Sequence, residues 1–460
     1  MTSSSSFASL HLPDAQLANL DSMGYHQMTP IQASALPVAL SGGDLIAQAK
    51  TGSGKTAVFA LAILGKLNIA SLQTQALVLC PTRELSIQVA TEVRRLARYQ
   101  QNIKVTTLYG GQPISLQKQS LQHGTHIVVG TPGRVKDLLE KKALALNMVH
   151  TLVLDEADRM LEMGFVKDIA AIIATTPAAR QTLLFSATFP DNIVALSKRF
   201  QREPTRISVD ARHNATDIRQ HVYFCDKDKK LSGLKTLLLC HQPESAVVFC
   251  NFKQTTRDAC DFLESEGFSA VALNGDLEQQ DREEILIRFK HQSCSVLVAT
   301  DVAARGLDIK ELPVVINYEL PPDPEIYVHR IGRTGRAGHT GLSLSLCTSH
   351  EQHKIDVINA YQHSQLRGES IASLRPSVVS IRPAANVTLC IAGGRKDKLR
   401  PGEILGALTG EHGLDGKEVG KIDVLDYASY VAVKKESADF AMQRLKNGKI
   451  KGRTLQIRRI

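Results

Sequence analysis

The sequence predicts an α/β protein with two parallel-sheet lobes and a smaller C-terminal domain. Three observations support this fold class. Short apolar runs alternate with helix-length stretches along residues 1–365, a polar segment at residues 209–217 interrupts the alternation once, and residues 384–460 follow a different order of strands and helices. A chain of 460 residues is also too long for one ordinary hydrophobic core, which agrees with several domains.

Residues 1–208 form the first predicted lobe. Its expected strands are apolar runs that each end in a polar or Gly/Pro turn, at residues 44–47, 76–80, 126–129, 151–154 and 182–185. Helix-length patterns lie between them, for example at residues 84–97 and 165–174. Such alternation is typical of a parallel sheet with helices on both faces, and these sheets bind ligands beyond the carboxyl ends of their strands.

Residues 218–365 form the second predicted lobe, which follows a linker at residues 209–217. The expected strands of this lobe lie at residues 246–250, 269–273, 295–299, 314–317 and 341–347. Two α/β lobes of similar size that are joined by a short linker suggest a cleft between them.

Residues 384–460 form a third predicted domain, which a polar stretch near residues 364–383 separates from the second lobe. Its expected β-α-β-β-α-β elements lie at residues 387–391, 401–409, 419–424, 429–433, 437–445 and 454–460. This order is that of a ferredoxin-like unit, the topology of RNA-recognition (RRM-like) domains. Residues 380–460 hold 16 Lys and Arg against 9 Asp and Glu. The surplus indicates either a polyanion-binding module or a basic solvated surface, and charge alone does not decide between them.

Composition excludes several other classes of protein. The apolar runs are far too short to span a bilayer, and the first residues lack the basic and apolar regions of a secretory signal. The eight cysteines are scattered without a CxxC pair or zinc-ligand spacing. We therefore expect a reducing, cytoplasmic location.

A glycine-rich segment, residues 49–56, follows the first expected strand and opens a helix at residues 55–66. In such a loop, backbone N–H groups cradle phosphates, Lys55 neutralises the β-phosphate and Thr56 can ligate Mg²⁺. The residues that line the expected cradle are Thr51, Gly52, Ser53 and Gly54. The usual G-x₄-GK[ST] pattern fails at its first position, Ala49, and the alternative is an ordinary Gly-rich turn.

Acidic residues follow the apolar strand at residues 151–154 directly. Asp155 is placed to hold Mg²⁺, and Glu156 is placed to orient or deprotonate the attacking water. Asp158 is better placed to link to residues 186–188, which follow the next strand. Alone, this segment would be an unremarkable start of a helix. Together with Lys55, it indicates a nucleotide-hydrolysing site.

At this point the sequence resembles the DEAD-box family of superfamily 2 RNA helicases, over about residues 1–365. The motifs stand in family order at residues 7, 24–32, 49–56, 81–85, 110–111, 131–134, 155–158, 186–188, 248–251, 279–282, 299–309 and 329–336. Ala49 is normal in this family. The resemblance implies two RecA-like lobes, ATP and Mg²⁺ as cofactors, and RNA-stimulated hydrolysis of ATP that locally unwinds RNA duplexes.

The resemblance also implies roles for individual residues. Gln32 has an amide that matches the edge of adenine, and Tyr25 offers a ring for the base; Phe7 and Asp308 complete the expected nucleotide contacts. Arg333 and Arg336 of the second lobe would act as arginine fingers, so hydrolysis would require the lobes to close. The residues expected to follow the RNA backbone are Arg83, Gly111, Thr131, Arg134, Arg282, Thr300 and Arg305.

Residues 384–460 also resemble the RNA-binding tail of one bacterial branch of this family, on segments 387–391, 393–396, 400–402, 413–416, 420–424 and 448–453. That resemblance implies recognition of a hairpin in 23S ribosomal RNA and a role in large ribosomal subunit assembly. The aromatic signature of RNA-recognition sheets is degenerate, with Tyr430 present but Val433 at the last aromatic position, so stacking on the sheet is doubtful. The expected contacts are instead in basic loops: Arg395, Lys396, Lys449, Lys451 and Arg453.

Two other functions share parts of this pattern. One is an RNA-binding assembly factor, an ATP-gated clamp for which strand separation is incidental. The other is a DNA translocase, which shares the phosphate loop and the arginine pair. Gln32, with the order of the motifs, argues against the translocase.

Overall fold

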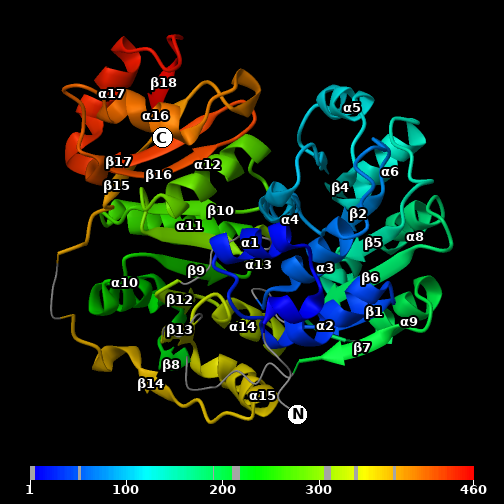
Figure 1. Cartoon of the computed structure of the whole chain (residues 1–460). Helices are drawn as coiled ribbons and strands as arrows, with labels where there is room; N and C mark the ends of the chain where they lie inside the picture. The colour runs from blue at the N-terminus through cyan, green and yellow to red at the C-terminus, as the bar shows by residue number, and fades with distance from the viewer. Residues whose placement is uncertain are drawn as a thin grey trace. The chain divides into compact units, whose positions relative to one another are not determined.

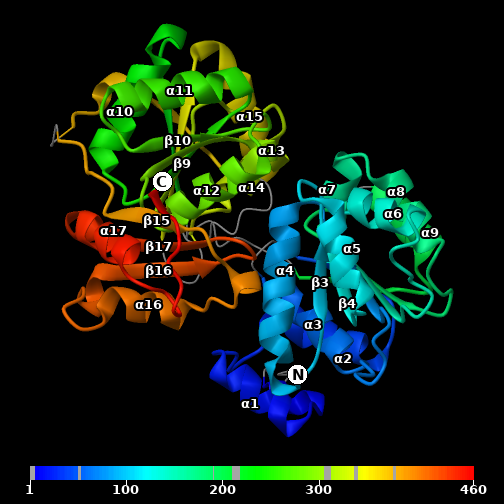
Figure 2. The same cartoon turned by 90° about the horizontal axis from the view of Figure 1, so that it is seen from above.

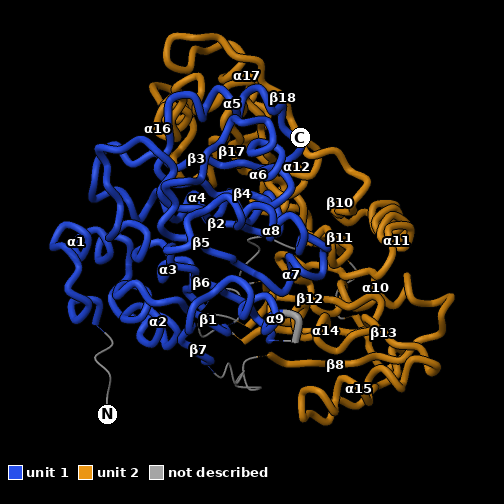
Figure 3. The backbone as a smooth tube through the Cα atoms, turned by 90° about the vertical axis from the view of Figure 1, so that its right-hand side faces the viewer, with its two compact units in different colours: residues 1–212, 306–308 blue, residues 213–305, 309–460 orange. Residues whose placement is uncertain are grey.

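The computed structural model describes residues 6–49, 53–189, 191–209, 218–304, 312–335, 340–376 and 380–460. The chain divides into two compact units, residues 1–212 with 306–308 and residues 213–305 with 309–460 (Figure 3). The predicted linker at residues 209–217 lies almost wholly outside the described residues.

The first unit is built on a seven-stranded, all-parallel sheet in the order β3-β4-β2-β5-β6-β1-β7 (Figure 1). Its strands are β1 (Leu45–Gln48), β2 (Ala76–Leu79), β3 (Val105–Leu108), β4 (Ile127–Gly130), β5 (Thr151–Leu154), β6 (Gln181–Ser186) and β7 (Thr205–Ser208). Its α-helices are α1 (Asp14–Ser22), α2 (Pro30–Ser41), α3 (Lys55–Leu64), α4 (Arg83–Leu96), α5 (Ile114–Gln122), α6 (Pro132–Glu140), α7 (Ala157–Glu162), α8 (Val166–Ile173) and α9 (Asp191–Phe200).

The inner strands of this sheet are mostly apolar because helices cover both of its faces. Alternate side chains of β2 enter two different cores: Ala76 and Val78 pack with helices α2, α3 and α4, whereas Leu77 and Leu79 pack with α6, α7 and α8. The two cores arise because successive side chains of a strand point to opposite faces of the sheet, and helices cover both faces. Because the strands are parallel, their carboxyl ends share one edge of the sheet, and most of the predicted site residues of this lobe follow these ends.

The second unit begins with another seven-stranded parallel sheet, in the order β10-β11-β9-β12-β13-β8-β14. Its strands are β8 (Ile218–Phe224), β9 (Ala246–Cys250), β10 (Ala270–Leu273), β11 (Val296–Thr300), β12 (Val314–Asn317), β13 (Gly341–Cys347) and β14 (Gly368–Ser370). Its α-helices are α10 (Lys230–His241), α11 (Lys253–Ser265), α12 (Gln279–Lys290), α13 (Asp301–Ala304), α14 (Pro324–Ile331) and α15 (Gln352–Gln362). Helices α10 and α11 share one core with the sheet, and α14 and α15 share another.

The C-terminal domain is a four-stranded antiparallel sheet in the order β16-β17-β15-β18. Its elements are β15 (Asn386–Ile391), α16 (Pro401–Thr409), β16 (Val419–Val424), β17 (Ser429–Lys434), α17 (Ala438–Asn447) and β18 (Ile457–Arg459). The β-α-β-β-α-β order, and with it the predicted fold class of two parallel lobes and a ferredoxin-like domain, is confirmed. The last strand is shorter than expected, since only residues 457–459 pair with β15.

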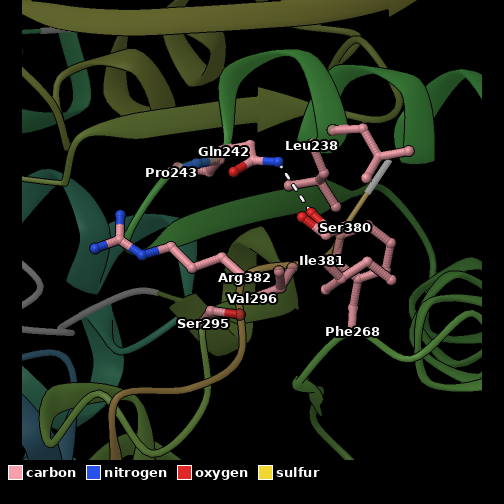
Figure 4. A pocket seen from close by; sticks show the side chains of 10 residues that line it. Leu238, Gln242, Pro243, Phe268, Ser295, Val296, Ser380, Ile381 and Arg382 are labelled. Carbon is pink, nitrogen blue, oxygen red and sulfur yellow. Dashed lines mark hydrogen bonds between the residues drawn. The ribbon is translucent and has the colours of Figure 1, made fainter. Parts of the chain in front are cut away.

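The described residues of the polar stretch near residues 364–383, which do not include residues 377–379, contact the second lobe. Strand β14 pairs with β8, and Ile381 packs against the core beneath α10. Figure 4 shows Ser380, Ile381 and Arg382 lying against the lobe, where the Gln242 side-chain amide donates to the Ser380 carbonyl at 3.0 Å. This connection therefore has contacts of its own with the lobe.

The two faces of the C-terminal sheet have different neighbours. Helices α16 and α17 cover one face, and α12 of the second lobe lies on the other (Figures 1 and 2). Ile287 of α12 packs with Cys390 and Tyr430 of the sheet, and Tyr430 is only 3% exposed. Asp423 accepts from Lys290 at 2.6 Å and hydrogen-bonds with the buried His291 ring at 3.0 Å. The sheet surface on which RNA bases would stack is thus occupied by protein.

Among the described residues, no helix combines the length and the apolar character that crossing a membrane requires.

Candidate nucleotide and RNA sites

The phosphate loop begins where β1 ends and closes on the start of α3. Gly54 precedes the helix with a φ of 94°, and a Cβ there would lie 2.5 Å from the Gln32 amide nitrogen, so only glycine fits. The buried Lys55 ammonium donates to the Ala49 carbonyl at 2.6 Å, which holds the lysine inside the loop. Thr51 and Gly52 lie outside the described residues.

Gln32 lies directly against this loop. Its Nε2 donates to the Gly54 carbonyl at 3.1 Å, and its Oε1 accepts from the Thr29 backbone at 2.8 Å in a capping box that starts α2. The Thr29 hydroxyl donates to the Ser53 carbonyl at 2.8 Å. Gln32, which sequence reasoning assigned to adenine alone, therefore also braces the phosphate loop. The Thr29 contact was not anticipated.

The two aromatic residues expected near the base contact each other. Phe7 and Tyr25 meet edge to face, with ring centroids 6.1 Å apart. Phe7 is buried, whereas the Tyr25 hydroxyl donates to Glu92 of α4 at 2.8 Å. Burial and the neighbouring Glu92 raise the pKa of Tyr25, so the phenol stays protonated. Phe7 supports the Tyr25 ring from behind, and Glu92 fixes its far end.

The acidic segment after β5 contains two buried carboxyl groups in different environments. Burial raises the pKa of Asp155 to about 6, although the nearby Lys55 charge opposes this effect. Asp158 instead accepts three hydrogen bonds on one oxygen, from the Ala187 backbone at 3.1 Å and from the backbone and hydroxyl of Thr188 at 3.0 Å each. The predicted link between Asp158 and residues 186–188 is confirmed.

Glu156 lies between these two residues in the sequence and is the N-cap residue of α7. Its backbone is left-handed, with a φ of 50°, which is unusual for a residue with a side chain and is often found at functional sites. The Glu156 N–H donates to the Asp155 carboxylate at 3.0 Å. This turn directs the two successive side chains differently, since Asp155 is buried and Glu156 is partly exposed.

Four residues expected to contact RNA lie at the carboxyl ends of β2, β3 and β4, which are neighbours in the first sheet. Arg83 begins α4, and its guanidinium lies under Gly111, where a Cβ would come within 1.8 Å of it. Thr131 occupies the N-cap position of α6 without a side-chain capping bond, and Arg134 donates two hydrogen bonds to the Gln112 carbonyl at 3.2 and 3.1 Å. The fold therefore brings the four expected residues to one edge of the sheet.

In the second lobe, Arg282 and Thr300 lie at the ends of neighbouring elements. Arg282 on α12 donates to the Ala303 carbonyl at 3.2 Å, and Thr300 ends β11. Arg333 follows α14, and its carbonyl accepts from Leu312 at 3.3 Å. Arg305, Asp308 and Arg336 lie outside the described residues.

Arg330 is a structural centre that sequence reasoning did not single out. It is 2% exposed and donates to both oxygens of Asp301 at 2.6 and 2.7 Å, to Asn251 at 2.8 Å and to the Glu319 carbonyl at 2.6 Å. These bonds tie the ends of β9, β11 and β12 to α14, three residues before Arg333. The position of Arg330 within the motif at residues 329–336 could have indicated its importance from the sequence.

The basic loops of the C-terminal domain lie side by side. Lys451 donates to the Lys398 carbonyl at 2.8 Å and to Glu403 at 3.0 Å. Arg395 pairs with Asp426 at 3.4 Å, and Arg453 lies 4.0 Å from Asp397. Lys396 and Lys449 are exposed. The surface formed by these loops is distinct from the sheet face that α12 covers.

Comparisons with known proteins agree with this architecture. A DEAD/DEAH box helicase model matches residues 29–196, a helicase conserved C-terminal domain matches residues 229–338, and a DbpA RNA binding domain matches residues 388–459. The chain is 52% identical to the ATP-dependent RNA helicase DbpA of Escherichia coli, over 97% of both chains. It is 36% identical to DbpA of Bacillus subtilis, over 96% of both chains.

A solved structure of Saccharomyces cerevisiae Dbp5 bound to RNA and ADP BeF3 is also similar, with a TM-score of 0.73 and 30% identity over 80% of this chain and 96% of that one. These matches confirm the helicase resemblance, ATP as the nucleotide, and an RNA-binding C-terminal domain. The chain therefore belongs to the DEAD-box family of ATP-dependent RNA helicases.

Proposed function

We propose that this helicase hydrolyses Mg²⁺-bound ATP at the loop and acidic turn of its first lobe, and that its C-terminal domain directs it to a hairpin of 23S ribosomal RNA during large-subunit assembly. The main support for the catalytic part of this proposal is the difference in environment between the carboxyl groups of Asp155 and Asp158. The Asp155 carboxyl has a raised pKa beside Lys55, whereas Asp158 is committed to backbone N–H groups.

The residues present fit a magnesium ion. Burial makes the ionised Asp155 carboxylate unfavourable even with Lys55 nearby, so a further cation would stabilise it. The Asp155 carboxyl and the Thr56 hydroxyl supply the oxygen ligands that Mg²⁺ prefers. The described residues hold no cluster of three or more metal-ligating side chains. That agrees with an ion held by one carboxylate, a hydroxyl and phosphates. When bound, the ion would neutralise phosphate charge.

The other residues of the site have separate tasks in this proposal. Lys55 leaves the Ala49 carbonyl and binds the β- and γ-phosphates, and Glu156 orients the attacking water and accepts its proton. Thr51, Gly52, Ser53 and Gly54 surround the phosphates, and Gln32 and Tyr25 hold adenine, with Phe7 behind the ring. Asp308 contributes to the nucleotide contacts, and Arg333 with Arg336 stabilises charge on the γ-phosphate.

RNA binding has two parts: the lobes contact the RNA backbone, and the C-terminal domain recognises the target RNA. In the lobes, Arg83, Gly111, Thr131, Arg134, Arg282, Thr300 and Arg305 contact phosphates and sugars, which carry little base information. In the C-terminal domain, Arg395, Lys396, Lys449, Lys451 and Arg453 contact the ribosomal hairpin. The relatives named DbpA and the sixteen basic residues within residues 380–460 support this assignment.

The addressing role is tested with the full chain and two matched pairs of substitutions. Lys396→Gln with Lys449→Gln removes two exposed charges from the proposed RNA surface, and Lys434→Gln with Lys435→Gln removes two exposed charges elsewhere in the same domain. Binding of a 23S hairpin and of a scrambled hairpin is measured against salt concentration. The first pair should lower the salt slope by about 1.4, at about 0.7 for each phosphate that the protein no longer neutralises, and should reduce the preference for the 23S hairpin.

The control pair should change neither the slope nor the preference. Equal affinity of the parent protein for both hairpins would overturn the ribosomal address. RNA-stimulated ATP turnover without release of a paired strand, measured on the same hairpin, would favour the ATP-gated clamp over duplex unwinding.

A further inference from the structure

Two apolar side chains lie exposed at the carboxyl edge of the sheet of the second lobe. Among the large apolar residues of the described chain, Phe252 and Val302 are the most exposed, at 66% and 61%. We propose that these two residues form a platform on which one unstacked base of single-stranded RNA lies. The proposal rests on the RNA contacts proposed for Arg282 and Thr300 of this lobe, and it adds a contact with a base to those contacts with the backbone.

Strand pairing brings the two residues to the same place in the lobe. Strands β9 and β11 are parallel neighbours, and their last residues, Cys250 and Thr300, are register partners. Phe252 and Val302 each follow this pair by two residues, at the starts of α11 and α13. Isolated exposed apolar residues are common on protein surfaces. Here, however, the two most exposed ones lie together at the edge where this lobe is proposed to bind RNA.

Phe252 occupies a position at which a helix favours a different kind of residue. It is the N-cap residue of α11, and its side chain makes no capping hydrogen bond. Ser, Thr, Asp and Asn are preferred there because their side-chain oxygen accepts a backbone N–H of the first turn. A phenylalanine gives up that bond, and an exposed ring gains little from burial in return. Folding therefore does not account for this residue, and such departures from local preference are expected at functional sites.

The surroundings of the platform are cationic. Lys253 and Arg257 of α11 both pair with Asp276, Arg257 at 2.7 Å, so two cations share one carboxylate. Arg282 of α12 donates to the Ala303 carbonyl of α13 at 3.2 Å, which places its guanidinium beside the same loops. Single-stranded nucleic acids are bound by this combination, in which cations follow the phosphates and exposed aromatic faces stack with the bases.

The chemistry of the two side chains defines what they can hold. Neither carries a hydrogen-bonding group, so they cannot bind a phosphate or distinguish one base from another. The face of an aromatic ring stacks with any base, because every base has a π face. In a duplex the bases are paired and stacked on each other, so their faces are not available to Phe252. The platform would therefore favour a separated strand over a paired one.

The test is a double-mutant cycle on the full-length protein. Phe252→Ser removes the ring and Phe252→Tyr keeps it, while Tyr361→Ser on α15 is the control, because Tyr361 is another exposed aromatic residue of this lobe. The RNA is a short single strand that cannot form a hairpin, with an abasic nucleotide placed at each position in turn. Affinity is measured by fluorescence anisotropy with a non-hydrolysable ATP analogue.

We expect one abasic position to weaken binding to the parent, to Phe252→Tyr and to the control by about 5-fold or more, the scale of losing one stacked base. Phe252→Ser should weaken binding of the intact strand by a similar factor, and the same abasic change should have little further effect on it. Phe252→Ser should nevertheless unfold at a higher denaturant concentration than the parent, because serine can cap α11. A destabilised Phe252→Ser variant would assign the ring to folding and overturn the proposal.

Arg282→Ala separates failure of this inference from failure of the proposed function. If Arg282→Ala weakens binding of the single strand but Phe252→Ser does not, the platform is refuted, while the backbone contacts of the second lobe stand. If every abasic position weakens Phe252→Ser as much as the parent, the ring does not hold a base, which also refutes the platform. If neither variant weakens binding, the RNA contacts proposed for the second lobe are themselves overturned.

Discussion

Asp155 and Asp158, three residues apart in one acidic turn, should respond in opposite directions to the same substitution. Replacement of Asp155 by Asn removes a carboxylate whose charge is buried, and the Asn oxygen can still accept the Glu156 N–H. Replacement of Asp158 by Asn weakens three hydrogen bonds to a charged oxygen. Without nucleotide, Asp155→Asn should stabilise the first lobe and Asp158→Asn should destabilise it.

The magnitude for Asp155 follows from its pKa, which burial raises from an ordinary 3.8 to about 6. Such a difference corresponds to at most about 3 kcal/mol at neutral pH, because each pKa unit is about 1.4 kcal/mol. Between pH 3.8 and about pH 6, the folded protein binds more protons than the unfolded chain, so the free energy of unfolding falls as pH rises. The loss is complete above about pH 6. For Asp158→Asn, the weakening of charge-assisted bonds should cost about 1–3 kcal/mol.

The assay is chemical unfolding of the nucleotide-free protein, followed by circular dichroism at several pH values between about 4 and 8. Asp155→Asn should match the parent near pH 4 and gain stability progressively up to pH 6, with a constant difference beyond it. A variant that is no more stable than the parent at pH 7.5 would refute the assignment of Asp155 as a carboxylate destabilised by burial. A stabilised Asp158→Asn variant would refute the bracing role of that residue.

Three further substitutions test other parts of the site. Gln32→Ala should weaken ATP binding and reduce the preference for ATP over GTP, measured by nucleotide titration, because the side chain braces Gly54 and is proposed to contact the base; an unchanged preference would leave Gln32 with the bracing role alone. Arg333→Ala should lower RNA-stimulated ATP turnover by about 10³-fold with little change in nucleotide affinity, and an unaltered rate would remove it as an arginine finger. Gly111→Ala should weaken RNA binding several-fold without affecting ATP affinity, because the new methyl group displaces the Arg83 guanidinium and strains a backbone with a φ of 80°; unchanged RNA affinity would contradict this placement of Arg83.

The fold was largely predictable because its strands are buried on two faces. Runs such as β2 and β9 are apolar without interruption, and their positions follow directly from the sequence. Strands β3, β7, β8 and β14 were missed because they lie at or near the edges of the sheets and carry polar residues. Strand β14 has three residues and is defined only by its pairing with β8, a contact that no local pattern encodes.

The sequence pointed to the residues of the candidate site, whose roles stay predictions, but not to their contacts. Motif spacing located Lys55, Asp155 and Asp158, whereas the pKa of a carboxyl group depends on burial that only the folded chain reveals. The contact between Gln32 and Gly54 joins residues from different elements and could not be read from spacing. The covered face of the C-terminal sheet was also only partly predictable. Val433 at the last aromatic position made base stacking doubtful, but only the structure shows that Ile287 packs on Tyr430 and covers this face.

In the proposed mechanism, Glu156 activates water for ATP hydrolysis, and RNA strand separation depends on the ATP site that contains Glu156. The most direct measurement is RNA-stimulated ATP turnover and strand release by Glu156→Gln on a 23S hairpin with a paired strand, beside the parent protein. The substitution keeps the size of the side chain and removes its carboxylate. We predict that the variant binds ATP and RNA as the parent does but loses multiple-turnover hydrolysis. Hydrolysis at the parent rate would contradict the role of Glu156 and, with it, the proposed mechanism.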